Sequence, residues 1–356
     1  ASVVRDIRAG ADRSLYMDSG DVSQGAPIYN VFLGEAEFRF LSELGLDVMA
    51  AGNHDFDSGA PNLADKIGRF ASFPVLAANY KFNPSGTTIM PPLSDLLSPY
   101  EIFNLKGLRV GVIGLGNIST ISTIIEAGNS MGIVPLESAT TTQYYIDMIR
   151  PMVDVVIVLT HLGLNDDQKL IACTSGADIV FGGHHHVVLN PPKVMSDGEP
   201  ECLTRPMRTE CVAGVRKALA DYVVTAAEAA SICSDDLIVE SRRMPWKPGS
   251  RPADDVIAAR CAAALPFQAV LTEEEAADPQ LRIAAVLHAA TNQCEVMANS
   301  LGYTPPDRRP VILVHSGSFA KYVGRMDVVF RQVAEGSNDW DVASFKYDPI
   351  PIDSRV

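Results

Sequence analysis

Four apolar segments of this sequence each end in a short polar cluster, and these clusters constrain the fold more than any other feature. Each cluster follows an apolar run that we interpret as a strand, and the clusters collect five of the seven histidines. Because open α/β sheets place their chemistry outside the carboxyl ends of their strands, we expect the four clusters to converge. They are Ser19-Gly20-Asp21, Gly52-Asn53-His54-Asp55-Phe56-Asp57, Thr160-His161-Leu162-Gly163 and Gly182-Gly183-His184-His185-His186.

Strand-like runs alternate with helical periodicity through the first 200 residues. This alternation makes a layered α/β sheet the default architecture. The periodicity predicts helices at 27–44, 60–70, 138–149 and 166–173, and strands at 46–50, 74–78, 108–115, 153–159 and 177–181.

The strand predicted at 108–115 carries the glycine pattern Gly111-x-x-Gly114-x-Gly116. A dinucleotide-binding loop would also need a small residue at Ser119 and an acidic group about twenty residues further on. Neither requirement is met convincingly, so we interpret the pattern as a strand that ends in a glycine turn.

The composition changes between residues 201 and 306, where alanine dominates. Helical patterns occur at 209–230, 253–264 and 281–301, and strand patterns return at 310–315 and 322–330. The sequence therefore predicts an α/β domain formed by residues 1–200 and 307–356, interrupted by a helical insertion at 201–306.

The net charge of −14 argues against a nucleic acid polymer as partner, because neutralising phosphates requires a basic surface. No run approaches the roughly 18 apolar residues that would suggest a membrane span. The six cysteines form no CxxC pair, which weighs against a zinc ribbon. We interpret them as buried or free thiols, although their even number also permits disulfides if the protein is exported.

Carboxylate, imidazole and amide oxygen are the ligands of Zn, Mn or Fe, and the clusters lack the thiolates typical of structural zinc. Taken singly, each cluster has a simpler interpretation, such as a turn residue, a core histidine or a surface run. Their recurrence at strand ends favours a metal site. If the segment after Gly183 is extended, His184 and His186 point to one side and His185 to the other.

These motifs resemble those of the calcineurin-like metallophosphoesterases, and most of all their 5′-nucleotidase branch. The resemblance covers about 1–200 and 307–352. It rests on the last three polar clusters, on Gly20-Asp21-x-x-Gln24-Gly25, on Ala78-Asn79 and on His315-Ser316-Gly317-x-x-x-Lys321-Tyr322-x-Gly324-Arg325. It implies a four-layer α/β/β/α sandwich with a dinuclear metal centre.

The resemblance also implies a role for individual residues. Asp21 would bridge two metal ions, and His186 would belong to one of the two sites. Asn53, His161 and His184 would complete the other site. His54 would polarise the phosphate or protonate the leaving oxygen, with Asp57 orienting it.

The sequence departs from the family at two places. A strand ending in Asp-x-His is expected just before Ala1 and does not occur in this sequence. Either the sequence begins after that strand, which we favour and which leaves the expectation of two divalent ions unchanged, or the protein holds one ion firmly and the second weakly or not at all. A C-terminal domain with base-stacking aromatic residues is also absent, which leaves the substrate-binding residues unknown. The family implies a periplasmic or extracellular location, while residues 1–10 contain no signal peptide pattern.

We therefore expect metal-dependent hydrolysis of a small phosphomonoester, above all a nucleotide, by metal-activated water. Alternatives within the same fold are a 2′,3′-cyclic nucleotide or nucleotide-sugar phosphoesterase and a thiosulfohydrolase. A rival from another class is a non-catalytic binding protein with an incomplete metal site. The insertion at 201–306 is a candidate docking module for a partner.

Overall fold

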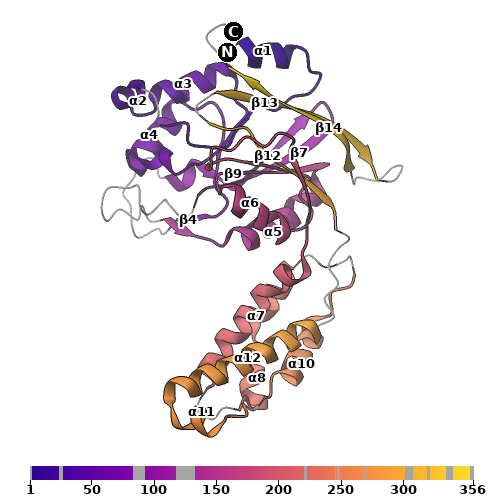
Figure 1. Ribbon diagram of the computed structural model, residues 1–356. Helices are drawn as coiled ribbons and strands as arrows, with labels where there is room; N and C mark the ends of the chain where they lie inside the picture. The colour runs from indigo at the N-terminus through magenta and orange to yellow at the C-terminus, as the bar shows by residue number, and fades with distance from the viewer. Residues whose placement is uncertain are drawn as a thin grey trace. The chain divides into compact units, whose positions relative to one another are not determined.

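The computed structural model describes residues 2–23, 27–82, 93–117, 133–219, 223–244, 246, 249–267, 269–300, 308–318, 321–333 and 340–352. The chain divides into two compact units, Ala1–Asp197 with Arg309–Val356 and Gly198–Arg308. The first unit contains the sheets and the second contains helices (Figure 1).

Two sheets form the body of the first unit. One has the order β1 (Met17–Asp18), β2 (Val48–Ala50), β3 (Val75–Leu76) and β5 (Leu97–Ser98), with all neighbours parallel. The other has the order β11 (Lys193–Ser196), β12 (Pro310–His315), β10 (Ile179–Gly182), β9 (Val155–Thr160), β7 (Leu108–Leu115) and β6 (Tyr100–Leu105). Its four central strands are parallel, and its two edge strands pair antiparallel with their neighbours.

Alternation along the strands builds the layers, because successive side chains point to opposite faces. One face of each sheet packs against the other sheet, as Val48 and Ala50 do against Ile157 and its neighbours. The outer face of the first sheet packs on α3 (Glu35–Leu44) and α4 (Ala60–Phe70). The outer face of the second packs on α5 (Ser138–Ile149) and α6 (Leu164–Ala172) (Figure 1). The predicted α/β/β/α sandwich is confirmed.

Glycines in β7 allow close packing in these layers. A Cβ atom at Gly114 would lie 2.1 Å from the Cβ atom of Leu76 in the opposite sheet, and one at Gly111 would lie 2.7 Å from Ile149. The strand ends at Leu115, as predicted, and the glycines inside it serve close packing, a role that the sequence pattern did not predict.

The helix predicted at 27–44 is two helices, so that prediction is wrong in part. α2 (Pro27–Phe32) ends where Leu33 and Gly34 adopt left-handed backbone angles, with φ of 50° and 98°. Gly34 has no Cβ and tolerates this conformation, which reverses the chain before α3 begins. In the second unit the helix predicted at 209–230 is likewise two helices, α7 (Pro200–Lys217) and α8 (Ala226–Ile232).

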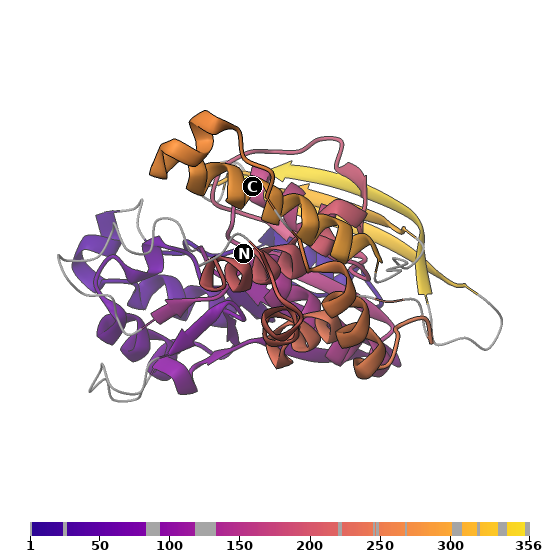
Figure 2. The ribbon, with the colours of Figure 1, turned by 90° about the horizontal axis from the view of Figure 1, so that it is seen from below.

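A long antiparallel ribbon of β13 (Tyr322–Gln332) and β14 (Trp340–Pro351) completes the first unit, and both views show it in yellow (Figure 1, Figure 2). Its apolar side chains, including Met326 and Phe345, pack against the core between the sheets. The remaining elements are α1 (Ser2–Ala9), the antiparallel pair of β4 (Tyr80–Phe82) and β8 (Ile133–Pro135), and the 3₁₀ turns η1 (His54–Phe56), η2 (Leu93–Asp95) and η3 (Arg150–Met152).

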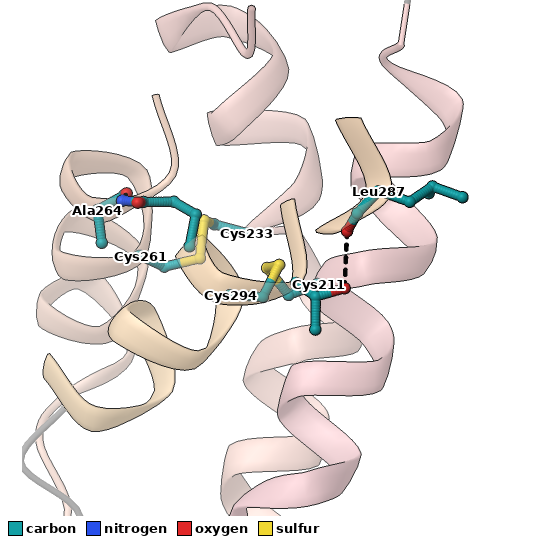
Figure 3. Close-up of a disulfide and its surroundings, with 8 residues drawn as sticks. Cys211, Cys233, Cys261, Ala264, Leu287 and Cys294 are labelled. Carbon is teal, nitrogen blue, oxygen red and sulfur yellow. Dashed lines mark hydrogen bonds between the residues drawn. A yellow bond between two sulfur atoms is a disulfide. The ribbon is translucent and has the colours of Figure 1, made fainter. Parts of the chain in front are cut away.

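The helices of the second unit pack around two disulfides. Cys211 of α7 is bonded to Cys294 of α12 (Pro279–Ser300), and Cys233 after α8 is bonded to Cys261 of α10 (Asp254–Ala264) (Figure 3). No cysteine in the described part of the chain is free, so the interpretation of the cysteines as free thiols is wrong. The unit also contains α9 (Asp235–Arg243) and α11 (Glu273–Ala277).

Among the helices in the described ranges, none combines the length and the apolar character that crossing a lipid bilayer requires.

Candidate metal centre

The ends of β1 and β2 lie against each other, and glycines make this contact fit. A Cβ atom at Gly52 would lie 2.3 Å from both the backbone N and the Oδ1 atom of Asp21. A Cβ atom at Gly20 would lie 2.6 Å from the backbone N of Gly52. Asp21 itself has a left-handed φ of 61°, which is uncommon for a residue other than glycine. The two strand ends therefore hold the Asp21 carboxylate in one place.

Asp55 joins the loop after β1 to the loop after β2 by hydrogen bonds. Its carboxylate accepts hydrogen bonds from the backbone N–H groups of Asp21 (3.1 Å), Ser23 (3.2 Å) and Gly52 (2.8 Å). The side chain is almost fully buried, and burial raises its pKa. No role for Asp55 follows from the sequence, because Asp21 and Ser23 precede it by 34 and 32 residues and leave no local pattern.

The second sheet contributes two histidines to the same place. The Nδ1 atom of His161 lies 2.6 Å from the carbonyl oxygen of Ser19, and the Nε2 atom lies 2.8 Å from Oδ2 of Asp21. His184 lies beside His161, with ring centroids 5.2 Å apart. One candidate ligand atom each from Asp21, His161 and His184 lie within 4.8 Å of one another. We call these three residues the ligand cluster.

The electrostatics of the ligand cluster differ from residue to residue. Burial alone would raise the pKa of Asp21, but the close contact with His161 and the charge of that ring hold the pKa below its usual value. Burial alone would lower the pKa of His161, and the Asp21 carboxylate outweighs burial and raises it. Burial and the charge of His161 lower the pKa of His184. A neutral His184 has a lone pair available for a cation.

Two buried polar atoms of the site have no hydrogen-bond partner, as expected of atoms that bind a divalent metal ion. Nε2 of His161 has no hydrogen bond of acceptable geometry, although it faces Asp21 closely, and Oδ1 of Asn53 has no partner. When Nδ1–H of His161 donates to the carbonyl of Ser19, Nε2 carries a lone pair that faces the Asp21 carboxylate. The lone pair and the carboxylate repel each other unless a cation lies between them. An imidazole held by a carbonyl in this way is the common arrangement of metal-binding histidine. The donor set of carboxylate, imidazole and amide oxygen suits Zn, Mn or Fe.

His54 and Asp57 form a second feature at the edge of the site. The 3₁₀ turn η1 places Nδ1 of His54 2.9 Å from Oδ2 of Asp57. The backbone N–H of His54 donates to Oδ1 of Asp21 at 2.8 Å, so this pair is joined to the ligand cluster. The Asp57 side chain is mostly buried, while 41% of the His54 side chain is exposed. Burial raises the pKa of Asp57 even though His54 acts in the opposite direction.

The segment after β10 is not extended, and the prediction of its geometry is wrong. His184 and His186 have left-handed φ angles of 72° and 57°, because the chain turns directly after Gly183. His185 packs on Gly163 and its Nδ1 accepts the backbone N–H of Leu164 at 3.0 Å. Among the described residues, the ligand cluster includes His184 and does not include His186.

All seven site residues named from the sequence lie in the described ranges, whereas Gln24 and Gly25 of the first motif lie outside them. Asp21, His161 and His184 come together, and Asn53, His54 and Asp57 lie in the loop that contacts Asp21. The roles of these residues as ligands or catalysts remain predictions.

Comparison with known proteins matches residues 1–188 to the calcineurin-like phosphoesterase family. The snake venom 5′-nucleotidase of Gloydius brevicauda is 32% identical over 196 residues, which are 54% of this chain and 32% of that protein. The 5′-nucleotidase of Rattus norvegicus is 32% identical over 193 residues, 53% of this chain and 32% of that protein. The chain spans about a third of the length of these relatives.

Two solved structures share the fold. The 5′-nucleotidase precursor from Thermus thermophilus superimposes with a TM-score of 0.58 at 20% identity, covering 98% of this chain and 47% of that one. The calcineurin-like phosphoesterase YfkN from Bacillus subtilis superimposes with a TM-score of 0.54 at 17% identity, covering 100% of this chain and 82% of that one. At these identities the likeness concerns the fold alone.

Proposed function

The chain belongs to the calcineurin-like phosphoesterase family, and on that premise we propose that it hydrolyses a phosphomonoester with the help of a bound divalent metal ion. The observation that carries the proposal is the ligand cluster, in which the buried Nε2 of His161 faces the Asp21 carboxylate at 2.8 Å and carries a lone pair in the tautomer whose Nδ1–H donates to the carbonyl of Ser19. Asp21, His161 and His184 are the proposed ligands, and the buried Oδ1 of Asn53 is the fourth.

A divalent ion at this place supplies Lewis acidity for activating water and for the charge that develops on the phosphoryl group. The chain's own residues bind the phosphate and supply the proton for the leaving group. The His54 side chain is partly exposed, and its contact with Asp57 through Nδ1 leaves Nε2 as the ring nitrogen that faces outward. The outward Nε2 is suited to hydrogen-bond the phosphate or to give a proton to the leaving oxygen, and the Asp57 carboxylate orients the ring.

A nucleotide is the substrate we propose. Support comes from the relatives named 5′-nucleotidase, which are 32% identical over about half of this chain. A second ion with His186 among its ligands remains a prediction, since His186 does not join the ligand cluster in the described residues.

The test combines metal analysis with turnover. The purified chain should bind Mn²⁺ or Zn²⁺ and release phosphate from AMP in preference to 2′,3′-cyclic AMP, a nucleotide sugar or a thiosulfate ester. Asp21→Ala should empty the site, whereas His54→Ala should keep the metal and lower turnover by about 10²–10⁴-fold. Bound metal without turnover of any of these substrates would instead indicate a binding protein.

We also propose that the protein works in an oxidising compartment such as the periplasm or the extracellular space. Both fully described disulfides are buried in the helical unit, and structural disulfides persist mainly outside the cytosol. Thiol labelling of the protein isolated from its source under denaturing conditions should find no reactive cysteine. Six labelled thiols would place it in a reducing compartment.

A further inference from the structure

Three polar side chains outside the ligand cluster are buried together near the carboxyl ends of the second sheet's strands. Thr160 is the last residue of β9, His315 is the last residue of β12, and Asp167 reaches them from α6. The Thr160 hydroxyl donates to Oδ1 of Asp167 at 2.5 Å, and Nε2 of His315 lies 2.8 Å from Oδ2. All three residues are at most 1% exposed. We call them the buried bridge.

The buried bridge spans the strand that carries His184. β10 lies between β9 and β12 in the sheet, and its last residue, Gly182, passes directly beside the carboxylate. A Cβ atom at Gly182 would lie 2.1 Å from Oδ2 of Asp167 and 2.3 Å from Nε2 of His315. Because Gly182 has no side chain, the Asp167 carboxylate has space to contact both Thr160 of β9 and His315 of β12.

Each end of the buried bridge adjoins a proposed ligand. Thr160 directly precedes His161 in the chain. His315 is paired in register with Gly182, two residues before His184, and its carbonyl accepts the backbone N–H of Leu189 at 3.0 Å. The turn that contains His184 is thus fixed to the end of β12 both before and after the ligand.

We propose that the buried bridge is the positioning device that sets the separation of His161 and His184. The proposal rests on the proposed metal centre. A buried carboxylate is stable only while its oxygens are hydrogen-bonded, so Thr160 and His315 must stay in place around Asp167. Metal coordination tolerates errors of only about 0.2 Å in ligand distance. Asp167, Thr160 and His315 do not touch the metal or the substrate and act through the two histidines.

The first experiment compares two buried aspartates at opposite ends of β10. Asp167→Ala leaves the Thr160 hydroxyl and His315 Nε2 without their acceptor next to the ligand cluster. Asp178→Ala is the matched control, because Asp178 is 4% exposed, precedes β10 and is held by Arg150 and the backbone N–H of Val156. Mn²⁺ affinity is measured by calorimetry, the Co²⁺ site by its visible spectrum, and the metal-free protein by thermal unfolding.

We expect both variants to melt at lower temperature, while only Asp167→Ala weakens Mn²⁺ binding by about 10–100-fold, the usual effect of disturbing a group behind a ligand. Its Co²⁺ spectrum should change as well. Asp178→Ala should bind within about twofold of wild type, as expected for a distant and independent site. Equal affinities in the two variants would show that Asp167 has only a structural role and would overturn the proposal.

A second pair of variants keeps the proposal falsifiable if Asp167→Ala does not fold. His315→Gln retains a donor for the Asp167 carboxylate and should preserve Mn²⁺ affinity, whereas His315→Leu removes the donor and should lose it. Similar affinity in the two variants would overturn the proposal. A wild-type protein that binds no Mn²⁺ or Co²⁺ would refute the metal centre itself, an outcome distinct from wild-type binding that the variants leave unchanged.

Discussion

Adding one methyl group at Gly52 should remove Asp21 from the metal site. The new Cβ atom would lie 2.3 Å from Oδ1 and from the backbone N of Asp21, whereas ordinary contacts begin at 3.4 Å. The Asp21 side chain or its loop must therefore move by about 1 Å. This displacement exceeds the roughly 0.2 Å that metal coordination tolerates, so Gly52→Ala should lose a ligand outright.

The magnitude follows from the same geometry. Overpacking a rigid site lowers the free energy of unfolding by about 1–3 kcal/mol, which a well-folded domain survives. Loss of a direct ligand should reduce metal affinity by more than the about 10–100-fold seen when outer groups are changed. Turnover at limiting metal should fall in parallel.

The assay measures bound metal by elemental analysis, Mn²⁺ affinity by calorimetry and thermal unfolding by circular dichroism. Gly10→Ala is the control, because the nearest atoms to its new Cβ would be 3.5 Å and 3.7 Å away. That variant should resemble wild type in all three measurements. A Gly52→Ala protein that binds Mn²⁺ with wild-type affinity would refute the reasoning, since it would mean that Asp21 does not need its observed position.

Three further predictions concern stability and the independence of the two units. Replacing both Cys211 and Cys294 by Ser opens a loop of 83 residues and should destabilise the helical unit by about 4.5 kcal/mol in the chain-entropy description, as measured by denaturant unfolding, without changing metal content. Burial alone would raise the pKa of Asp154, but the hydrogen bonds and charge of Arg109 lower it. The stabilisation is therefore present above pH 3.8 and fades as pH falls below it, so the stability difference between wild type and Asp154→Asn should shrink on acidification, and a constant difference would contradict this. Replacing residues 198–308 by an Asn-Gly turn, which would close β11 and β12 into a hairpin, should preserve phosphate release and abolish any association that depends on this unit.

Local patterns in the sequence were sufficient to place most of the elements that carry the site. Buried strands and amphipathic helices have different periods, so β7, α4 and α5 begin and end at the residues that the periodicity predicts. The polar clusters were recognisable because each interrupts an apolar run. Convergence of Asp21, His161 and His184 follows from the rule that parallel strands of a layered α/β fold end at one edge.

Contacts between residues distant in sequence leave no periodic signal, and only the tertiary structure decides them. The left-handed turn at His184 depends on its connection to the end of β12, and the role of Asp55 depends on amide groups of the loop that follows β1. The pairing of Cys211 with Cys294 is likewise set by how α7 packs on α12, because cysteine spacing alone permits many pairings. The sequence thus determines which side chains arrive at the strand ends, whereas packing between the strands and helices determines how each of them is held.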